Sequence, residues 1–547
     1  MSRSKTFLSG VSLAYLYQGS MMVVGLWLTP FYLRHLGAHD YGVWLVGLQV
    51  LNFLLLCDLG VLAVTPRDIA QAHGHELAQG DSDPLRLLVG RLFKTVLVQS
   101  VLVAIVATGL FIFRPVAASG LRGPVALVLL VFVLTFPLRC AGAILQGLQD
   151  LKFLGQLRMW LWGISAAMVV AMLIGGAGFY ALACGWCLQE AGGNVVAVFR
   201  ARQLRPDLFN RDAWRQAGPF RWQWLARGLW ISLGQVSTSL VGGTDLLITG
   251  RVFGAATVVI YSCTGKLVQV LQQQPQVLAS TALPGLSQMK TSEGLRQIQK
   301  ATTCLTQAMI FVAGGIVCVV LPLNQQFIDH WIGARYFGGV TLTALFLANF
   351  LVRLIDYTLA IALFAFGHEK LYAIRSLLDG VVSVTLASIL ARPLGLNGVI
   401  LGFLCGGLLV AIPLDIYHFA KEFEVSLLGA MRPYAAYLWR IAAVSGAAFL
   451  IMRHVETRNL FGVAVAGVLA GLLYLAVTLP YVRNSELGGY VRAAMPSLPI
   501  WRFVWPKAAE SAPYVAGNGS DEPEVVAVGT VEGLADAAKS GKDTGNG

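Results

Sequence analysis

The chain has 547 residues, of which 56% are apolar and only 12% are charged, and its mean hydropathy is +0.68. Soluble domains carry about 25% charged residues, so this composition excludes an ordinary soluble protein. Apolar runs of roughly 20 residues or more recur along most of the chain and indicate a helical, polytopic membrane protein. The net charge of +12 does not point to a nucleic-acid partner, because the basic residues gather in alternate loops, as the positive-inside rule describes.

Fourteen candidate membrane spans follow one another along the chain, and each is long enough to cross a hydrocarbon core of roughly 30 Å. They lie near residues 7–33, 41–64, 88–113, 124–147, 153–174, 177–199, 223–250, 255–283, 300–322, 338–366, 370–391, 395–420, 433–453 and 459–482. The basic start MSRSKTFLSG is typical of a signal peptide, but the apolar run continues without a small-residue cleavage site. We therefore expect a retained first helix.

Most basic residues fall on one side of these spans. That side carries Arg3, Lys5, Arg67, Arg86, Arg91, Lys94, Lys152, Arg158, Arg200, Arg202, Arg205, Arg211, Arg215, Arg221, Lys290, Arg296, Lys300, Lys370, Arg375, Lys421 and Arg432. The opposite loops carry only Arg34, Arg114, Arg122, Arg251, Arg335, Arg392, Arg453 and Arg458. Because basic loops stay in the cytoplasm, we expect both termini there.

The longest basic connection runs from Arg200 to Trp222, between spans six and seven. It divides the chain into two pseudo-symmetric lobes of six helices. The expected units are an N-terminal lobe at 1–210, a C-terminal lobe at 211–425, two extra spans at 426–485 and a cytoplasmic tail at 486–547. From about residue 507 the tail has no apolar period, and we expect it to be disordered.

A helical hairpin with polar residues at its turn appears once in each half. In the first half, Arg34 and Gly37 lie between two apolar helices, and in the second half Arg251 and Gly254 repeat the Arg-x-x-Gly spacing. A hairpin repeated in two halves predicts two lobes that face one another with a site between them.

Motifs of enzymes and of cofactor sites are absent from the sequence. The Cys184-Gly-Trp-Cys187 pair has redox spacing but lies inside a predicted helix, and the other cysteines also lie in apolar segments. There is no P-loop, nucleophile elbow or His/Cys metal cluster. The expected outer loops are too short for an enzyme acting on glycans at the outer face. We therefore expect a protein that is not an enzyme and that needs no cofactor.

Ionisable residues inside membrane spans are functional by default, because they cost about 2.5–3.5 kcal/mol to insert. Lys266 lies roughly 16 Å deep, near the midplane, and Arg139 and Arg353 lie roughly 22 Å from the outer ends of corresponding spans. We predict that these three cations bind a substrate phosphate in a central cavity. Two alternatives remain: Arg353 forms an internal ion pair with Asp356, or Arg139 snorkels to the interface.

Other charges are candidates for gating or ion coupling. Arg34 and Arg251 lie at the outer ends of their spans, where an interfacial role competes with a gate. The candidates for ion coupling are Asp58, Asp245 and Asp356, and Glu190 is a further candidate proton carrier. For Asp58, a helix break at the Asp-Leu-Gly sequence is the alternative.

Several short motifs in and around these hairpins resemble those of a known family. LTPFYLRHLGAHDYGVW at 28–44, CDLG at 57–60, TDLLITGRVFGAATVVIYSCTGKL at 244–267 and Pro-Gly-Leu-Ser at 284–287 are similar to the polysaccharide and O-antigen flippases (Wzx-like) of the MOP superfamily. This superfamily also includes the lipid II flippases and the MATE drug exporters. The resemblance covers about residues 7–482.

The resemblance implies a transporter that flips a polyprenyl-diphosphate-linked oligosaccharide from the inner to the outer leaflet by alternating access, for surface polysaccharide such as the O-antigen of lipopolysaccharide. It implies the bacterial cytoplasmic (inner) membrane and, as partners, the lipid-linked oligosaccharide, membrane lipids, H⁺ or Na⁺, and other polysaccharide-assembly membrane proteins. Two alternatives stay open: an ion-coupled multidrug exporter, which would usually have twelve spans and an acidic cavity, and a membrane glycan polymerase or ligase.

Overall fold

The computed structural model describes residues 3–80, 82–113, 121–209, 222–273, 275–276, 295–365, 369–452, 457–483, 455 and 488. All regular secondary structure in these residues is helical. The prediction of an all-α polytopic membrane protein is confirmed. The tail beyond residue 507, for which disorder is predicted, lies outside the described residues.

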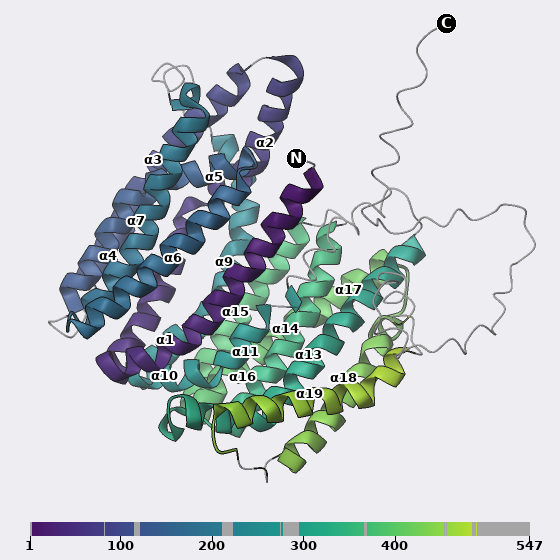
Figure 1. The fold of residues 1–547 in the computed structure, drawn as a ribbon. Coiled ribbons are helices and arrows are strands. Elements are labelled where there is room, and N and C mark those ends of the chain that lie inside the picture. Colours follow the sequence, from purple (N-terminus) through teal and green to yellow (C-terminus); the bar gives the residue numbers. More distant parts are fainter. Residues whose placement is uncertain are drawn as a thin grey trace, which may run out of the picture.

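The first half of the chain forms a group of helices at the left of Figure 1, which we call the N-terminal group. Its elements are α1 (Arg3–Leu54), η1 (Leu55–Asp58), α2 (Val61–Gln79), α3 (Asp83–Phe113), α4 (Arg122–Thr135), η3 (Phe136–Arg139), α5 (Cys140–Gly147), α6 (Leu151–Ile174), α7 (Phe179–Leu204) and η4 (Pro206–Phe209).

The second half forms the C-terminal group at the centre and right of Figure 1. Its elements are α9 (Trp222–Phe253), α10 (Ala255–Thr264), α11 (Lys266–Leu271), α13 (Leu295–Trp331), η5 (Ala334–Tyr336), α14 (Val340–Ala365), α15 (Glu369–Leu394), α16 (Leu396–Gly406), η6 (Gly407–Ala411), α17 (Ile412–Glu422), α18 (Leu427–Met452) and α19 (Leu460–Arg483). The last two helices lie along one edge of the group, where α13 packs against both of them.

Each half of the chain has a buried core of its own. One core draws its fully buried side chains, such as Phe132 and Ile144, from residues 51 to 208, and the other, with Tyr261 and Phe403, from residues 246 to 482. This grouping follows from apolar faces packing on their sequence neighbours. The lobe limits at 210 and 425 remain predictions.

The expected spans overlap described helices: the first lies in α1, and the second runs from α1 through η1 into α2. The expected ends at residues 283, 366 and 453 lie outside the described residues. Ten helices in the described part of the chain are long and apolar enough to cross a membrane. Among the remaining helices, α7 and α9 have 26 and 32 residues, and the apolar α10 has 10. Many large apolar side chains are exposed on the surface, for example Trp160 on α6 and Phe461 on α19. Such a surface suits contact with lipid.

The repeated hairpin is confirmed. Gly37 interrupts α1 with φ 77° and ψ 171°, and Gly254 separates α9 from α10 with φ 88° and ψ 165°. Both turns need a positive φ, which glycine adopts without the strain that a Cβ would add. The Arg-x-x-Gly spacing therefore marks the same backbone turn twice.

The two groups meet at the end of the bundle where these hairpin turns lie, which we call the hairpin end. There α1 packs on α9 and α10. A Cβ on Gly42 would overlap the carbonyl oxygen of Ala255, so the two backbones touch. The indole nitrogen of Trp331 on α13 donates to the carbonyl oxygen of Leu26 on α1 at 2.8 Å. These contacts close the hairpin end.

The opposite end carries the basic residues Arg86, Lys152 and Arg205, and we call it the basic end. In Figure 1, α1 runs from the N-terminus in the upper part of the picture down to the lower left, where it meets α10. The packing of α2 and η1 against α9 continues the junction of the two groups toward the middle of the bundle.

Candidate functional site

Lys266 begins α11, directly after the turn at Gly265 that ends α10. The residue is half-buried, and Cys263 one turn earlier is a titratable neighbour. Among the described residues no carboxylate lies within 4.0 Å of its ammonium and no hydrogen bond satisfies it. A half-buried cation without a compensating charge attracts an anionic ligand.

Arg139 lies at the end of η3, where Pro137 has tightened the helix. Its Nε and Nη2 atoms both contact Glu190 Oε1 on α7 at 2.8 Å. The amide nitrogen of Asn194 donates to the same oxygen at 2.8 Å. The guanidinium also lies over the ring of Phe132, 5.3 Å from its centroid. Arg139 is therefore held inside the protein by a carboxylate, and it does not reach the interface as a free snorkelling cation.

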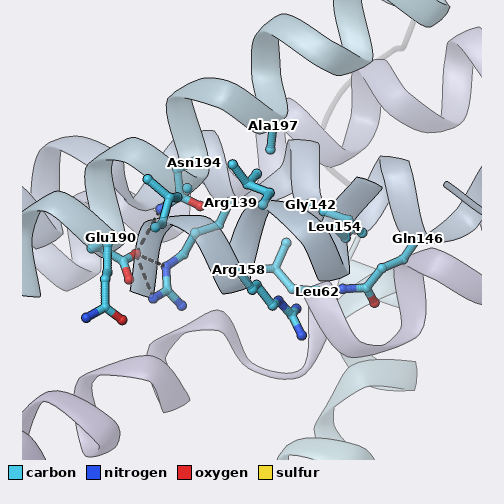
Figure 2. A pocket seen from close by; sticks show the side chains of 14 residues that line it. Leu62, Arg139, Gly142, Gln146, Leu154, Arg158, Glu190, Asn194 and Ala197 are labelled. Carbon is cyan, nitrogen blue, oxygen red and sulfur yellow. Dashed lines mark hydrogen bonds and ion pairs between the residues drawn. The ribbon is translucent and has the colours of Figure 1, made fainter. Parts of the chain in front are cut away.

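The Arg139–Glu190 pair lines a cavity of about 360 Å³ within the N-terminal group. Arg158 on α6 and Gln146 on α5 line it as well, and Figure 2 shows these side chains with Asn194 around the same space. The remaining wall is mostly leucine, alanine and glycine. The cavity combines charged groups with an apolar wall.

Arg353 on α14 has several partners in the C-terminal group. It forms a short ion pair with Asp379 of α15, and its Nη2 donates to Ser383 Oγ at 3.1 Å and to the carbonyl oxygen of Phe403 at 2.8 Å. Asp356, one turn away, lies at 4.0 Å. Arg353 therefore forms two ion pairs: the predicted pair with Asp356 is the longer one, and Asp379 is the principal partner.

Arg375 on α15 extends this network. It forms a short ion pair with Asp356 and a second with Asp415 of α17 at 2.9 Å. The side chains of Arg375 and Asp415 are 6% and 0% exposed. The sequence predicted Arg375 among the basic loop residues, and the loop position is wrong, because Arg375 lies buried on α15. It is buried because two carboxylates compensate its charge.

The network therefore joins three helices, α14, α15 and α17, through two guanidiniums and three carboxylates. The sequence analysis did not single out Asp379 or Asp415. The sequence did contain features that could have identified them. Both are acids inside apolar spans, and Arg375 and Asp379 are four residues apart on one helix face.

The other predicted charges lie apart from these clusters. Asp58 accepts a hydrogen bond from the Gly60 nitrogen at 2.9 Å, where the chain breaks between η1 and α2, which supports the helix-break alternative. Asp245 on α9 lies beside the buried Tyr261 of α10. Arg34 and Arg251 are exposed near the hairpin turns.

The structure thus brings none of the three predicted substrate cations together in one cluster. Arg139 belongs to the cavity of the N-terminal group, Arg353 to the network of the C-terminal group, and Lys266 to α11. The sequence predicted Glu190 only as a candidate proton carrier, and the structure shows it as the main partner of Arg139.

A third charged cluster lies at the basic end, outside the membrane spans. Arg205 contacts both oxygens of Glu76 at 2.7 and 2.8 Å and both oxygens of Asp207 at 2.9 and 2.8 Å. The guanidinium lowers the pKa of Asp207 to about 2 and also lowers the pKa of Glu76. Arg86 reaches Asp207 at 3.3 Å, so the cluster ties the ends of α2, α3 and α7 together.

Comparisons with known proteins agree with this architecture. A family model described as "Polysaccharide biosynthesis protein" matches residues 83–340. A search of curated proteins finds no match. The chain is similar to the solved structure of the lipid II flippase MurJ in an inward closed conformation, with a TM-score of 0.62 and 12% identity, over 87% of this chain and 99% of that one.

It is also similar to an inward-facing multidrug resistance MATE family transporter of the MOP superfamily, with a TM-score of 0.58 and 15% identity, over 75% of this chain and 99% of that one. An outward-facing structure of a MATE transporter of this superfamily gives a TM-score of 0.51 and 15% identity, over 76% of this chain and 93% of the other. At these identities the likeness shows a shared fold. The family match over residues 83–340 and this shared fold both agree with the resemblance seen in the sequence.

Proposed function

We propose that this chain is a polysaccharide flippase of the MOP superfamily and that it flips a polyprenyl-diphosphate-linked oligosaccharide from the inner to the outer leaflet of the bacterial cytoplasmic membrane. The product would serve the synthesis of surface polysaccharide such as O-antigen. The observation that carries the proposal is Lys266, a half-buried ammonium inside an expected span for which the described residues provide no carboxylate. A diphosphate supplies the missing negative charge.

The contacts between the two helix groups define the proposed transport cycle. With both termini in the cytoplasm, the closed hairpin end faces outward, and the diphosphate enters from the basic end. Separation of α1 from α10 near Arg34 and Arg251 then opens the outer side. This is rocking of two lobes around a fixed site, with the hairpin turns as the gate.

The charged groups take different parts in this cycle. Lys266 is the principal diphosphate ligand, and Arg139 supplies a second cationic position in the N-terminal group. Arg353 was predicted as a third ligand, but its guanidinium already has Asp379, Ser383 and a carbonyl oxygen as partners. We assign it instead to the scaffold that holds α14, α15 and α17 together.

Coupling to an H⁺ or Na⁺ gradient is the proposed energy source, with consumption of the product outside the membrane as the alternative. Asp356 and its network lie inside the spans of the C-terminal group and can respond to a cation there. Asp58 and Asp245 are weaker candidates, because a backbone nitrogen and a neighbouring tyrosine already occupy their surroundings.

Cells in which Lys266 is replaced by alanine test the proposal. At unchanged protein levels we expect loss of surface polysaccharide, with retention in a Lys266→Arg variant that keeps the charge. An Arg122→Gln variant, which removes an exposed cation at the start of α4, is the matched control. Normal export in Lys266→Ala cells would refute the site, and expulsion of cationic dyes by the wild type in place of glycan export would favour a drug exporter.

A further inference from the structure

The cavity of the N-terminal group is separate from the neighbourhood of Lys266. Every residue that lines it comes from α2, η3, α5, α6 or α7, and no described residue of the C-terminal group contributes. It therefore stays with one group of helices when the two groups move against each other. A ligand bound in it would be held by the N-terminal group alone.

The ion pair in the cavity is one-sided. Two nitrogens of Arg139 and the amide of Asn194 all contact a single oxygen, Oε1 of Glu190. The other oxygen, Oε2, has no hydrogen-bond partner among the described residues, and neither has Nη1 of Arg139. The carboxylate thus keeps an oxygen free to take a proton, and the guanidinium keeps donors free for an anion.

The guanidinium can change partners without losing its position. Phe132 lies beneath it and holds its plane, since cation–π contact does not depend on the carboxylate. Arg158 lines the same cavity and has no ion-pair or hydrogen-bond partner in the described part of the chain. With Arg139 and Arg158 charged and Glu190 ionised, the three groups carry one net positive charge.

We propose that this cavity is an exchange site in which a phosphate or diphosphate group replaces Glu190 as the partner of Arg139 while Glu190 takes up one proton. The phosphate oxygens accept hydrogen bonds from Arg139 and Arg158. The guanidinium stays over Phe132 but turns its donors from Glu190 to the phosphate, and the negative charge of the bound phosphate beside Glu190 disfavours a second anion there. It accepts a proton from water on Oε2, so one O–H bond forms and no other covalent bond changes.

The groups that face Glu190 are consistent with this exchange. Arg139 comes from η3, Arg158 from α6, and Cys187 and Asn194 from its own helix α7, while α2 contributes the apolar Leu62. Asp58 interacts electrostatically with the same Arg139 guanidinium. Among the described neighbours, no second carboxylate competes for the proton within the cavity lining.

Size and depth select the kind of ligand. A volume of about 360 Å³ is within the range of small-ligand sites and suits a group of the size of a diphosphate. Since α5 has 8 residues, Arg139 lies about 12 Å from the turn at its end. The anion can come from a lipid-linked diphosphate or from free diphosphate in water. The exchange rests on the proposed function only for the first of these sources.

Calorimetry on the purified full chain in nanodiscs, with inorganic diphosphate as the probe, tests the exchange. Titrations in two buffers with different heats of protonation give the number of protons bound with the anion. For the wild type we expect about one proton per diphosphate and weaker binding as the pH rises. Absence of binding, or binding without proton uptake, would overturn the proposal.

Variants separate the two partners. Glu190→Gln keeps an acceptor oxygen for Arg139 but cannot ionise, so it should bind diphosphate with about one proton fewer taken up than the wild type. The protonation of the diphosphate itself is common to both proteins and cancels in this difference. Arg139→Gln should weaken binding by about tenfold or more. Arg158→Gln, which removes a more exposed side chain, serves if Arg139→Gln does not fold. Unchanged binding and proton uptake in Glu190→Gln would also overturn the exchange, and Arg122→Gln is the control.

The source of the ligand and the transport function are tested separately. A short-chain polyprenyl diphosphate in the nanodisc that binds about tenfold more tightly than inorganic diphosphate identifies a lipid ligand. Equal affinities identify the free anion, and both results support the site. Because binding is measured without translocation, its failure would leave the Lys266 experiment in cells untouched, and the reverse also holds.

Discussion

Replacing Asp379 by asparagine should destabilise the C-terminal group strongly. The side chain is 5% exposed and is the closest carboxylate to the Arg353 guanidinium. After the change, Arg353 keeps Ser383 at 3.1 Å, a carbonyl oxygen at 2.8 Å and Asp356 at 4.0 Å, which Arg375 already uses. A buried guanidinium is left with no carboxylate of its own.

Two readings of the contact predict different magnitudes. If Asp379 contributes only a hydrogen bond between membrane helices, the loss is about 0.6 kcal/mol. If it compensates a buried charge, breaking the pair costs about 3–5 kcal/mol. The lower limit of that range is more than about a hundredfold in the unfolding equilibrium. The low exposure of both side chains favours the larger value.

Denaturant titration of the purified protein in mixed micelles, followed by the helical signal, measures this difference. Asp150→Asn is the matched control, because it breaks the Arg200–Asp150 pair, which has the same chemistry and a distance of 2.9 Å but is 34% and 20% exposed. We expect it to cost at most about 1 kcal/mol. If Asp379→Asn costs no more than Asp150→Asn, the reasoning about the network is refuted.

Two further predictions concern the ends of the bundle. Gly42→Leu should push α1 away from Ala255 and raise maleimide labelling of the native, buried Cys263, measured by mass spectrometry. Gly47→Leu on the same helix is the control, because a Cβ there meets no atom within 4 Å and labelling of Cys263 should not change. Equal labelling of Cys263 in the two variants would contradict the closed hairpin end. Because Arg205 lowers the pKa of Asp207 to about 2, below the ordinary value of about 3.9, the carboxylate stabilises the fold above pH 4, and this stabilisation is lost as the pH falls toward 2. Asp207→Asn should therefore flatten the fall in melting temperature between pH 4 and pH 2, and an unchanged slope would argue against the cluster.

The sequence predicted the elements of the fold well. Apolar length alone located most of the helices that are long enough to cross a membrane. The Arg-x-x-Gly repeat located the turns at Gly37 and Gly254, because only glycine adopts their backbone conformation easily. The inner end of the second span was not predicted correctly. The second span was expected to run through Asp58, but the chain breaks at Leu59 and Gly60 and restarts as α2.

The partners of the intramembrane charges could not be predicted in the same way. Glu190 lies 51 positions from Arg139, and Asp379 lies 26 positions from Arg353, so neither pair follows from the spacing on one helix. Such pairs depend on how helices pack and rotate against one another. Lys266 differs, because the absence of an acid within one helical turn in the sequence agrees with the absence of a carboxylate partner among the described residues.

The most direct test of the central claim is translocation by the purified protein. Proteoliposomes containing a polyprenyl-diphosphate-linked oligosaccharide report flipping as the fraction of glycan that an added glycosidase can cleave. We expect the wild type and Lys266→Arg to expose glycan with time, and Lys266→Ala to match vesicles without protein. Exposure in Lys266→Ala at the wild-type rate, or wild-type vesicles no faster than empty ones, would contradict the account.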